Sequence, residues 1–209
     1  MRIVITGGTG NTGAAPAATK ASGSNSGQAA GQGQGPGYGL VGASRNAGKD
    51  VQDFTPVATG EQAPDFKLPG VDGKDYTLSQ FKGKPVVLEF FATWCPHCQK
   101  DAPMMNQLSE AYKAKNVQVV GVNASQFGHN YEDQKDPSPV TMDDIKWFRD
   151  TFTVTFPLLY DPTVDVGIAY GVKGYPTVYV LKADGTVSGQ PKYPFTYDDL
   201  VAEVDKALK

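Results

Sequence analysis

The chain has 209 residues, a formal net charge of -3 and two cysteines. Its lysines and arginines are scattered rather than clustered, which argues against a basic face for nucleic acid or for an anionic membrane. The sequence therefore predicts no nucleic-acid partner. No apolar run approaches the ~20 residues that span a bilayer, so no direct membrane segment is predicted either.

The first quarter of the chain differs from the rest. Residues 1–53 are rich in Gly, Ala, Ser and Gln, have too few apolar side chains to build a core, and are predicted to be a disordered tail or linker. Residues 7–13 imitate a dinucleotide-binding glycine loop, but no helix with a packed face follows them. Residues 54–209 carry regular apolar segments and are predicted to form one domain.

The domain is predicted to begin with a β-hairpin, because residues 64–68 and 75–78 flank a turn at Asp72. Residues 85–92 are almost continuously apolar, as is typical of a strand in the buried centre of a sheet. A helix is predicted over residues 96–115. It opens on a proline, whose missing amide donor costs nothing at the first helical position.

The second half of the domain again alternates predicted strands and helices. Residues 117–122 are predicted to be a buried strand, residues 126–140 a polar loop, and Thr141 the N-cap of a helix. The remaining elements are a short strand over 156–160, a short helix over 164–170, a hairpin over 177–187 and a last helix from 196. The pattern predicts an α/β fold in which helices flank a mixed central sheet.

Both cysteines follow the first buried strand, in the sequence Trp-Cys-Pro-His-Cys at residues 94–98. Amides and the positive dipole end of a helix stabilise a thiolate, so Cys95 is the predicted nucleophile and Cys98 the resolving thiol. A structural disulfide or half a zinc site is the alternative. Zinc needs four ligands and only His97 and His129 remain as histidines, so no metal is predicted.

Neighbouring side chains are candidates to tune this pair. His97 is expected to lower the pKa of Cys95, unless it is simply an exposed helix residue. Glu89 interrupts the apolar strand, and a buried carboxylate there would have a raised pKa and relay protons to Cys98. If the strand instead turns Glu89 outward, it is a surface charge. Asp101 lies beside Cys98 on the helix surface, and its plain interpretation is an exposed first-turn acid that only complements the helix dipole.

Four separated motifs carry a family resemblance: Gln-Ala-Pro-Asp-Phe at 62–66, residues 78–88, Phe-Ala-Thr-Trp-Cys at 91–95 and Gly-Val-Lys-Gly-Tyr-Pro-Thr at 171–177. Together, over residues 60–209, they resemble the TlpA/ResA-type thioredoxin-like family of disulfide oxidoreductases in the redoxin superfamily. The resemblance implies a thioredoxin fold with an added N-terminal hairpin and a mid-domain insertion. It also implies an extracytoplasmic location and, often, a role in cytochrome c maturation.

The resemblance also implies roles for single residues. Glu89 corresponds to a buried acid near the second cysteine, and Asp101 to an acid that handles active-site protons. Pro176 corresponds to a cis-proline that lies against the disulfide and offers backbone groups to an extended peptide. The candidate substrate-contacting residues are Trp94, Pro96, Tyr175 and Pro176; for Trp94, plain core packing is the alternative. His129 and its loop are expected to be solvated surface.

The predicted activity is thiol–disulfide exchange with protein thiols and disulfides, such as apocytochrome c or other exported proteins, without a cofactor. The family implies a reductase recharged by a membrane-embedded or soluble donor. The Pro-His pair resembles DsbA, which leaves a disulfide-forming oxidase as an alternative. A peroxiredoxin-like thiol peroxidase is another, although Ala92 stands where those enzymes have Thr or Ser. The last alternative function is a non-enzymatic module that binds thiol-containing peptides without turnover. The tail would tether the domain to a membrane or be dispensable.

Overall fold

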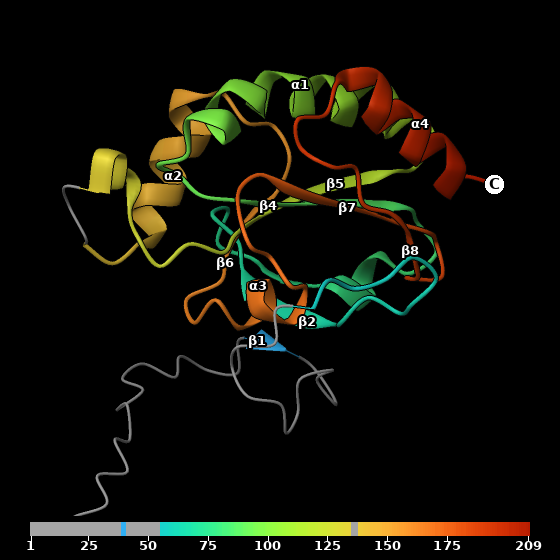
Figure 1. The fold of residues 1–209 in the computed structure, drawn as a ribbon, viewed down its shortest axis with the longest axis horizontal. Helices are drawn as coiled ribbons and strands as arrows, with labels where there is room; N and C mark the ends of the chain where they lie inside the picture. The colour runs from blue at the N-terminus through green and yellow to red at the C-terminus, as the bar shows by residue number, and fades with distance from the viewer. Residues whose placement is uncertain (1–38, 41–54, 135–137) are drawn as a thin grey trace, which may run out of the picture. The chain divides into compact units, whose positions relative to one another are not determined.

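The computed structural model describes residues 55–134 and 138–209, together with strand β1 (Gly39–Leu40), and is drawn in Figure 1. The predicted tail, residues 1–53, otherwise lies outside the described residues, as does the glycine-rich segment within it. Strand β1 falls inside that stretch and pairs with β2 (Phe66–Pro69) in antiparallel fashion. At these two residues the chain therefore joins the small hairpin sheet rather than remaining a linker.

The central sheet is mixed, as predicted, with the strand order β6-β5-β4-β7-β8. Strand β4 (Val86–Phe91) lies in the middle and is buried along its whole length. Strands β5 (Gln118–Asn123) and β6 (Leu158–Tyr160) continue the sheet in parallel on one side of β4. Strands β7 (Thr177–Leu181) and β8 (Val187–Gly189) are antiparallel on its other side.

Helices and a hairpin cover the two faces of this sheet (Figure 1). One face carries the helices α1 (Pro96–Lys113), α2 (Met142–Thr151) and α4 (Tyr197–Ala207). The other carries the predicted hairpin of β2 and β3 (Asp75–Thr77), the 3-10 helix η1 (Leu78–Phe81) and the short helix α3 (Asp165–Ala169). None of the helices among the described residues is long and apolar enough to cross a membrane.

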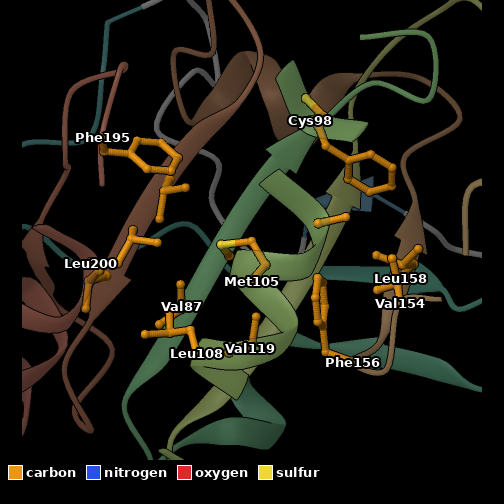
Figure 2. Close-up of a cluster of buried hydrophobic side chains, with 14 of the residues drawn as sticks. Val87, Cys98, Met105, Leu108, Val119, Val154, Phe156, Leu158, Phe195 and Leu200 are labelled. Atoms are coloured by element: carbon orange, nitrogen blue, oxygen red, sulfur yellow. The ribbon is translucent and has the colours of Figure 1, made fainter. Parts of the chain in front are cut away.

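Strand β4 divides the core because its side chains alternate between the faces. Val86, Leu88 and Phe90 pack with the hairpin and α3, whereas Val87 and Phe91 pack beneath α1. Figure 2 shows this second cluster, in which the α1 side chains Met105 and Leu108 lie among buried neighbours from the sheet. Glu89 has the same parity as Val87 and Phe91, so it points toward α1 and the cysteines.

Local signals explain where the other helices begin. Thr141 and Thr196 cap α2 and α4, and each makes a reciprocal capping box with an aspartate three residues later. The predicted polar loop over 126–140 is less irregular than expected, because it contains the 3-10 helix η2 (His129–Gln134). Stacking of Phe127 on Tyr131, with ring centroids 4.0 Å apart, accompanies this turn.

Candidate active site

The two cysteines lie at the carboxyl end of β4, where the chain enters α1. Cys95 is the N-cap residue of α1, and Cys98 is one turn further along the helix. Both are free thiols, and their residues are only 4% and 1% exposed, respectively. An incoming disulfide therefore meets only a small accessible part of Cys95, and Cys98 is less accessible still.

The surroundings of the two thiols drive their acidities apart. The hydrogen bond from the Cys98 thiol, helped by the amides of His97 and Cys98 and by the charge of His97, lowers the pKa of Cys95 to about 6. Burial, followed by the hydrogen bond with Cys95 and the charge of Glu89, raises the pKa of Cys98 well above its usual value. At neutral pH Cys95 is thus a thiolate and Cys98 a neutral thiol, the order that their predicted roles require.

Glu89 is buried beneath α1 with only 4% of the residue exposed, so the alternative of an outward-facing surface charge is wrong. Burial is the main cause that raises the pKa of Glu89 to about 8, and the charges of Asp101 and Cys95 add to it. Its own charge raises the pKa of Cys98, which places the carboxyl within electrostatic reach of the second thiol. This placement is the one that a proton relay needs.

Asp101 is half-buried on α1, and burial raises the pKa of its carboxyl against the opposing charges of Lys100 and His97. Its Oδ2 atom is buried and has no hydrogen-bond partner within the described part of the chain. The interpretation of Asp101 as an exposed acid that only complements the helix dipole is therefore wrong. The carboxyl forms a second acidic group next to Glu89, as the charge coupling between the two shows.

The predicted cis bond is present between Tyr175 and Pro176. The carbonyl oxygen of Tyr175 lies 3.5 Å from the Cys95 sulfur, so this loop covers the nucleophile. A groove of about 490 Å³ runs beside it, lined by residues 174–177 and 190–193. Pro96 is exposed at the start of α1, on the surface that a substrate would meet.

Trp94 is half-buried and connects the active site to the insertion, the segment over residues 126–140. Its indole N–H donates to Ser125 Oγ at 2.8 Å, and its ring meets Tyr131 and Tyr175 edge-on at 5.2 Å and 6.1 Å. The hydroxyl of Tyr175 in turn donates to the carbonyl of Ala124. Trp94, Tyr131 and Tyr175 thus form an aromatic wall next to Cys95. Trp94 packs within this group and is also partly exposed to a substrate.

His129 is not the free surface residue that the sequence suggested. Its Nδ1 atom pairs with the carboxylate of Asp144, and its ring stacks on Trp147 with centroids 4.3 Å apart. This pairing ties the insertion to α2. Among the residues that the structure describes, no group of three or more His, Cys, Asp or Glu side chains could hold a metal ion.

Sequence reasoning missed two aromatic residues at the site: Tyr131, which meets Trp94, and Tyr193. The ring of Tyr193 lies 5.1 Å from that of His97, and it lines the groove next to Pro176. The signal that could have found Tyr193 is a second Tyr-Pro pair at residues 193–194, whose peptide bond is also cis.

Comparison with known proteins agrees with this geometry. Residues 59–190 match the AhpC/TSA family. The chain is 34% identical over 133 residues to the thiol-disulfide oxidoreductase ResA of Geobacillus thermodenitrificans, a match that covers 64% of this chain and 68% of that protein. It is 36% identical over 131 residues to the thioredoxin-like protein YneN of Bacillus subtilis, covering 63% and 69% of the two chains.

A solved structure shows the same fold. The putative thiol:disulfide interchange protein DsbE from Chlorobium tepidum is 33% identical and superposes with a TM-score of 0.62, over 73% of this chain and 99% of that one. Fold, motif and relatives therefore agree. The chain belongs to the AhpC/TSA family and, within it, to the thiol–disulfide oxidoreductases of the TlpA/ResA type.

Proposed function

We propose that this chain reduces disulfides in protein substrates by cycling between a Cys95–Cys98 dithiol and a disulfide. The observation that carries the proposal is the opposite shift of the two thiol pKa values, with Cys95 lowered to about 6 and Cys98 raised. A thiolate at the site entrance can attack, and a protonated thiol behind it is held back until a mixed disulfide has formed.

The reaction proceeds in two exchange steps. The Cys95 thiolate attacks one sulfur of the substrate disulfide, which forms a mixed disulfide and releases the other sulfur as a thiolate. Cys98 then loses its proton and attacks the Cys95 sulfur, which releases the second substrate sulfur. The substrate gains two electrons, the chain is oxidised to the Cys95–Cys98 disulfide, and a donor dithiol returns the electrons in a further exchange.

We propose that Glu89, in its ionised form, accepts the proton of Cys98 and becomes the neutral acid. A carboxyl with a pKa of about 8 is a far better match for a thiol proton than an ordinary glutamate, and it lies within electrostatic reach of Cys98. Asp101 raises the pKa of Glu89 and is half-buried beside it, so the two acids share the proton that leaves the site.

The proposed substrates are extended segments of unfolded or exported proteins, such as apocytochrome c. The groove beside Pro176 offers backbone groups to such a segment, and the aromatic wall around Trp94 offers apolar contact. We further propose that the domain works outside the cytoplasm, where the tail acts as a spacer to a membrane anchor and a membrane-embedded or soluble donor supplies electrons.

The acidity of Cys95 favours the direction of reduction over the DsbA-like alternative. A pKa of about 6 lies nearer to the ~7 of thioredoxin than to the ~3.5 of the strong oxidant DsbA. The deciding measurement is the reduction potential of the couple in glutathione buffers. A value near roughly -270 mV supports a reductase, and one near roughly -120 mV contradicts it.

Trapping tests exchange itself. Cys98→Ala should accumulate mixed disulfides between Cys95 and protein partners, because the resolving thiol is gone, whereas the matched Cys95→Ala variant should trap none. If Cys98→Ala traps no partner, the exchange mechanism fails and a module that only binds peptides becomes the better account. Peroxide consumption by Cys95 far above the rate of a free thiol would instead favour the peroxidase.

A further inference from the structure

Tyr193 sits between the core and the active site, in the segment that joins β8 to α4. The residue is 39% exposed, yet its ring contacts other rings on two sides. It meets the buried Phe195 edge-on with centroids 5.4 Å apart, and it meets His97 at 5.1 Å with an angle of 49° between the ring planes. Tyr193 thus connects a fixed core residue to an exposed histidine.

The position of His97 matters because it lies between the two cysteines on the first turn of α1. The charge of His97 is one of the causes that lower the pKa of Cys95. An exposed histidine samples several rotamers, and its electrostatic effect on a nearby sulfur falls as the distance grows. A neighbouring ring that restricts the imidazole therefore acts on the sulfur as well.

A second observation places Tyr193 at the reacting groups. Besides burial, the charges of Asp101, Cys95 and Cys98 all raise the pKa of its hydroxyl, so the ring lies within electrostatic reach of each of them. The same side chain lines the groove that passes Pro176. Tyr193 is therefore next to the path of the substrate as well as against His97.

We propose that Tyr193 is a positioning residue whose ring holds the imidazole of His97 beside Cys95 and thereby adjusts the redox balance of the Cys95–Cys98 pair. The inference rests on the proposed function, since it assigns His97 to the support of the Cys95 thiolate. Loss of the ring frees His97 toward solvent, weakens that support and makes the dithiol state less favourable relative to the disulfide.

The test is the equilibrium of the purified protein with glutathione. In this reaction two glutathione thiols give two electrons and two protons to the protein disulfide, yielding the protein dithiol and glutathione disulfide. Tyr193→Ala should shift the equilibrium constant toward the protein disulfide by about threefold, the size of effect that a single aromatic contact supports. That factor corresponds to a potential roughly 14 mV more negative.

Three further variants separate positioning from simple loss of bulk. Tyr193→Phe keeps the ring and should have the same equilibrium constant as the wild type. Tyr76→Ala removes a partly buried ring at the distant hairpin, where Tyr76 stacks on Phe81, and should leave the equilibrium unchanged. In a His97→Ala background, Tyr193→Ala should have no further effect, because the group that it positions is absent.

Two results would overturn the proposal. One is a Tyr193→Ala protein, folded by its thermal unfolding curve, whose equilibrium constant matches that of the wild type. The other is a threefold effect that persists in the His97→Ala background, because Tyr193 would then act without His97. Neither result depends on a protein substrate, so both are distinct from a failure of Cys98→Ala to trap partners, which would count against the proposed function itself.

Discussion

Strand β4 presents Val86, Leu88 and Phe90 to one face of the central sheet and Val87, Glu89 and Phe91 to the other. The first set packs into an apolar cluster with the hairpin and α3, where Phe90 lies 4.9 Å from the ring of Tyr170. The second set lies beneath α1 with both cysteines. One strand therefore supplies a packing face and, through a single ionisable residue, a chemical face.

The difference has a thermodynamic consequence. Apolar side chains on the first face stabilise the fold through burial, by roughly 1.5–3 kcal/mol for each large side chain. Glu89 on the second face is buried where its charged form is disfavoured, so it opposes folding at neutral pH. The comparison predicts that mutations on the first face change stability alone, whereas mutation of Glu89 on the second face changes both the chemistry and the pH dependence of stability.

The largest effect is expected at the nucleophile. Cys95→Ser should reduce the rate of disulfide reduction by at least roughly a thousandfold, as removal of a catalytic nucleophile does. The measurement is insulin reduction or turnover of a model disulfide. Substantial residual turnover would mean that Cys98 or another group attacks first.

A mutation on the packing face should instead lower the stability of the fold and leave the chemistry of the cysteines unchanged. Leu88→Ala removes a fully buried side chain from the apolar cluster and should lower the free energy of unfolding by about 2–5 kcal/mol. The reduction potential of the folded protein should stay the same, since Leu88 faces away from the cysteines. Denaturant unfolding and glutathione equilibration check the two halves. A shifted potential would show that the faces are not separate.

Glu89→Gln should make the reduced protein more stable at pH 8 than the wild type. The pKa of Glu89 is about 8 in the fold against 4.5 as its usual value, so the unfolded state releases its proton first as the pH rises. The penalty is absent below pH 4.5, grows up to pH 8 and is constant above it. Glutamine removes this penalty.

We expect Glu89→Gln to gain about 2–4 kcal/mol at pH 8 and little at pH 4.5, with slower resolution of mixed disulfides by Cys98. Denaturant unfolding of both proteins at the two pH values checks the stability, and stopped-flow release of substrate checks the rate. An equal difference at both pH values would show that Glu89 does not titrate as described.

A smaller effect is expected at the edge of the chemical face. Tyr131→Ala removes the ring that meets Trp94 and should raise KM for a protein substrate about threefold while kcat stays unchanged. Phe127→Ala should give the same result, because Phe127 stacks on Tyr131. A loss in kcat instead would indicate that the aromatic wall shapes the reacting sulfur rather than the binding of substrate.

The sequence was informative where a local pattern decides the structure. The apolar run around Glu89 predicted the central strand, and Thr141 with Asp144 predicted the start of α2. The side-chain alternation that turns Glu89 inward could not be settled without the positions of α1 and the sheet. Burial of Glu89 therefore depends on the tertiary packing of α1 on the sheet, although its apolar neighbours in the sequence favoured a buried position.

Contacts between distant segments could not be predicted. Tyr193 meets His97 on α1, and His129 meets Asp144 and Trp147 on α2, only because the tertiary fold brings each residue against a helix from another part of the chain. A polar loop looks the same in a sequence whether its histidine is solvated or paired. The pairing of β1 with the hairpin was missed for the same reason, since two residues in a glycine-rich stretch carry no strand pattern.

The central claim is that Cys95 is held as a thiolate at neutral pH by its place at the start of α1 and by Cys98. The most direct test is the rate of alkylation of reduced protein by iodoacetamide as a function of pH. We predict a midpoint near 6 for Cys95, moving upward in Cys98→Ala because the main stabilising hydrogen bond is lost. A midpoint near 9.0, the ordinary value of a cysteine thiol, would contradict the account.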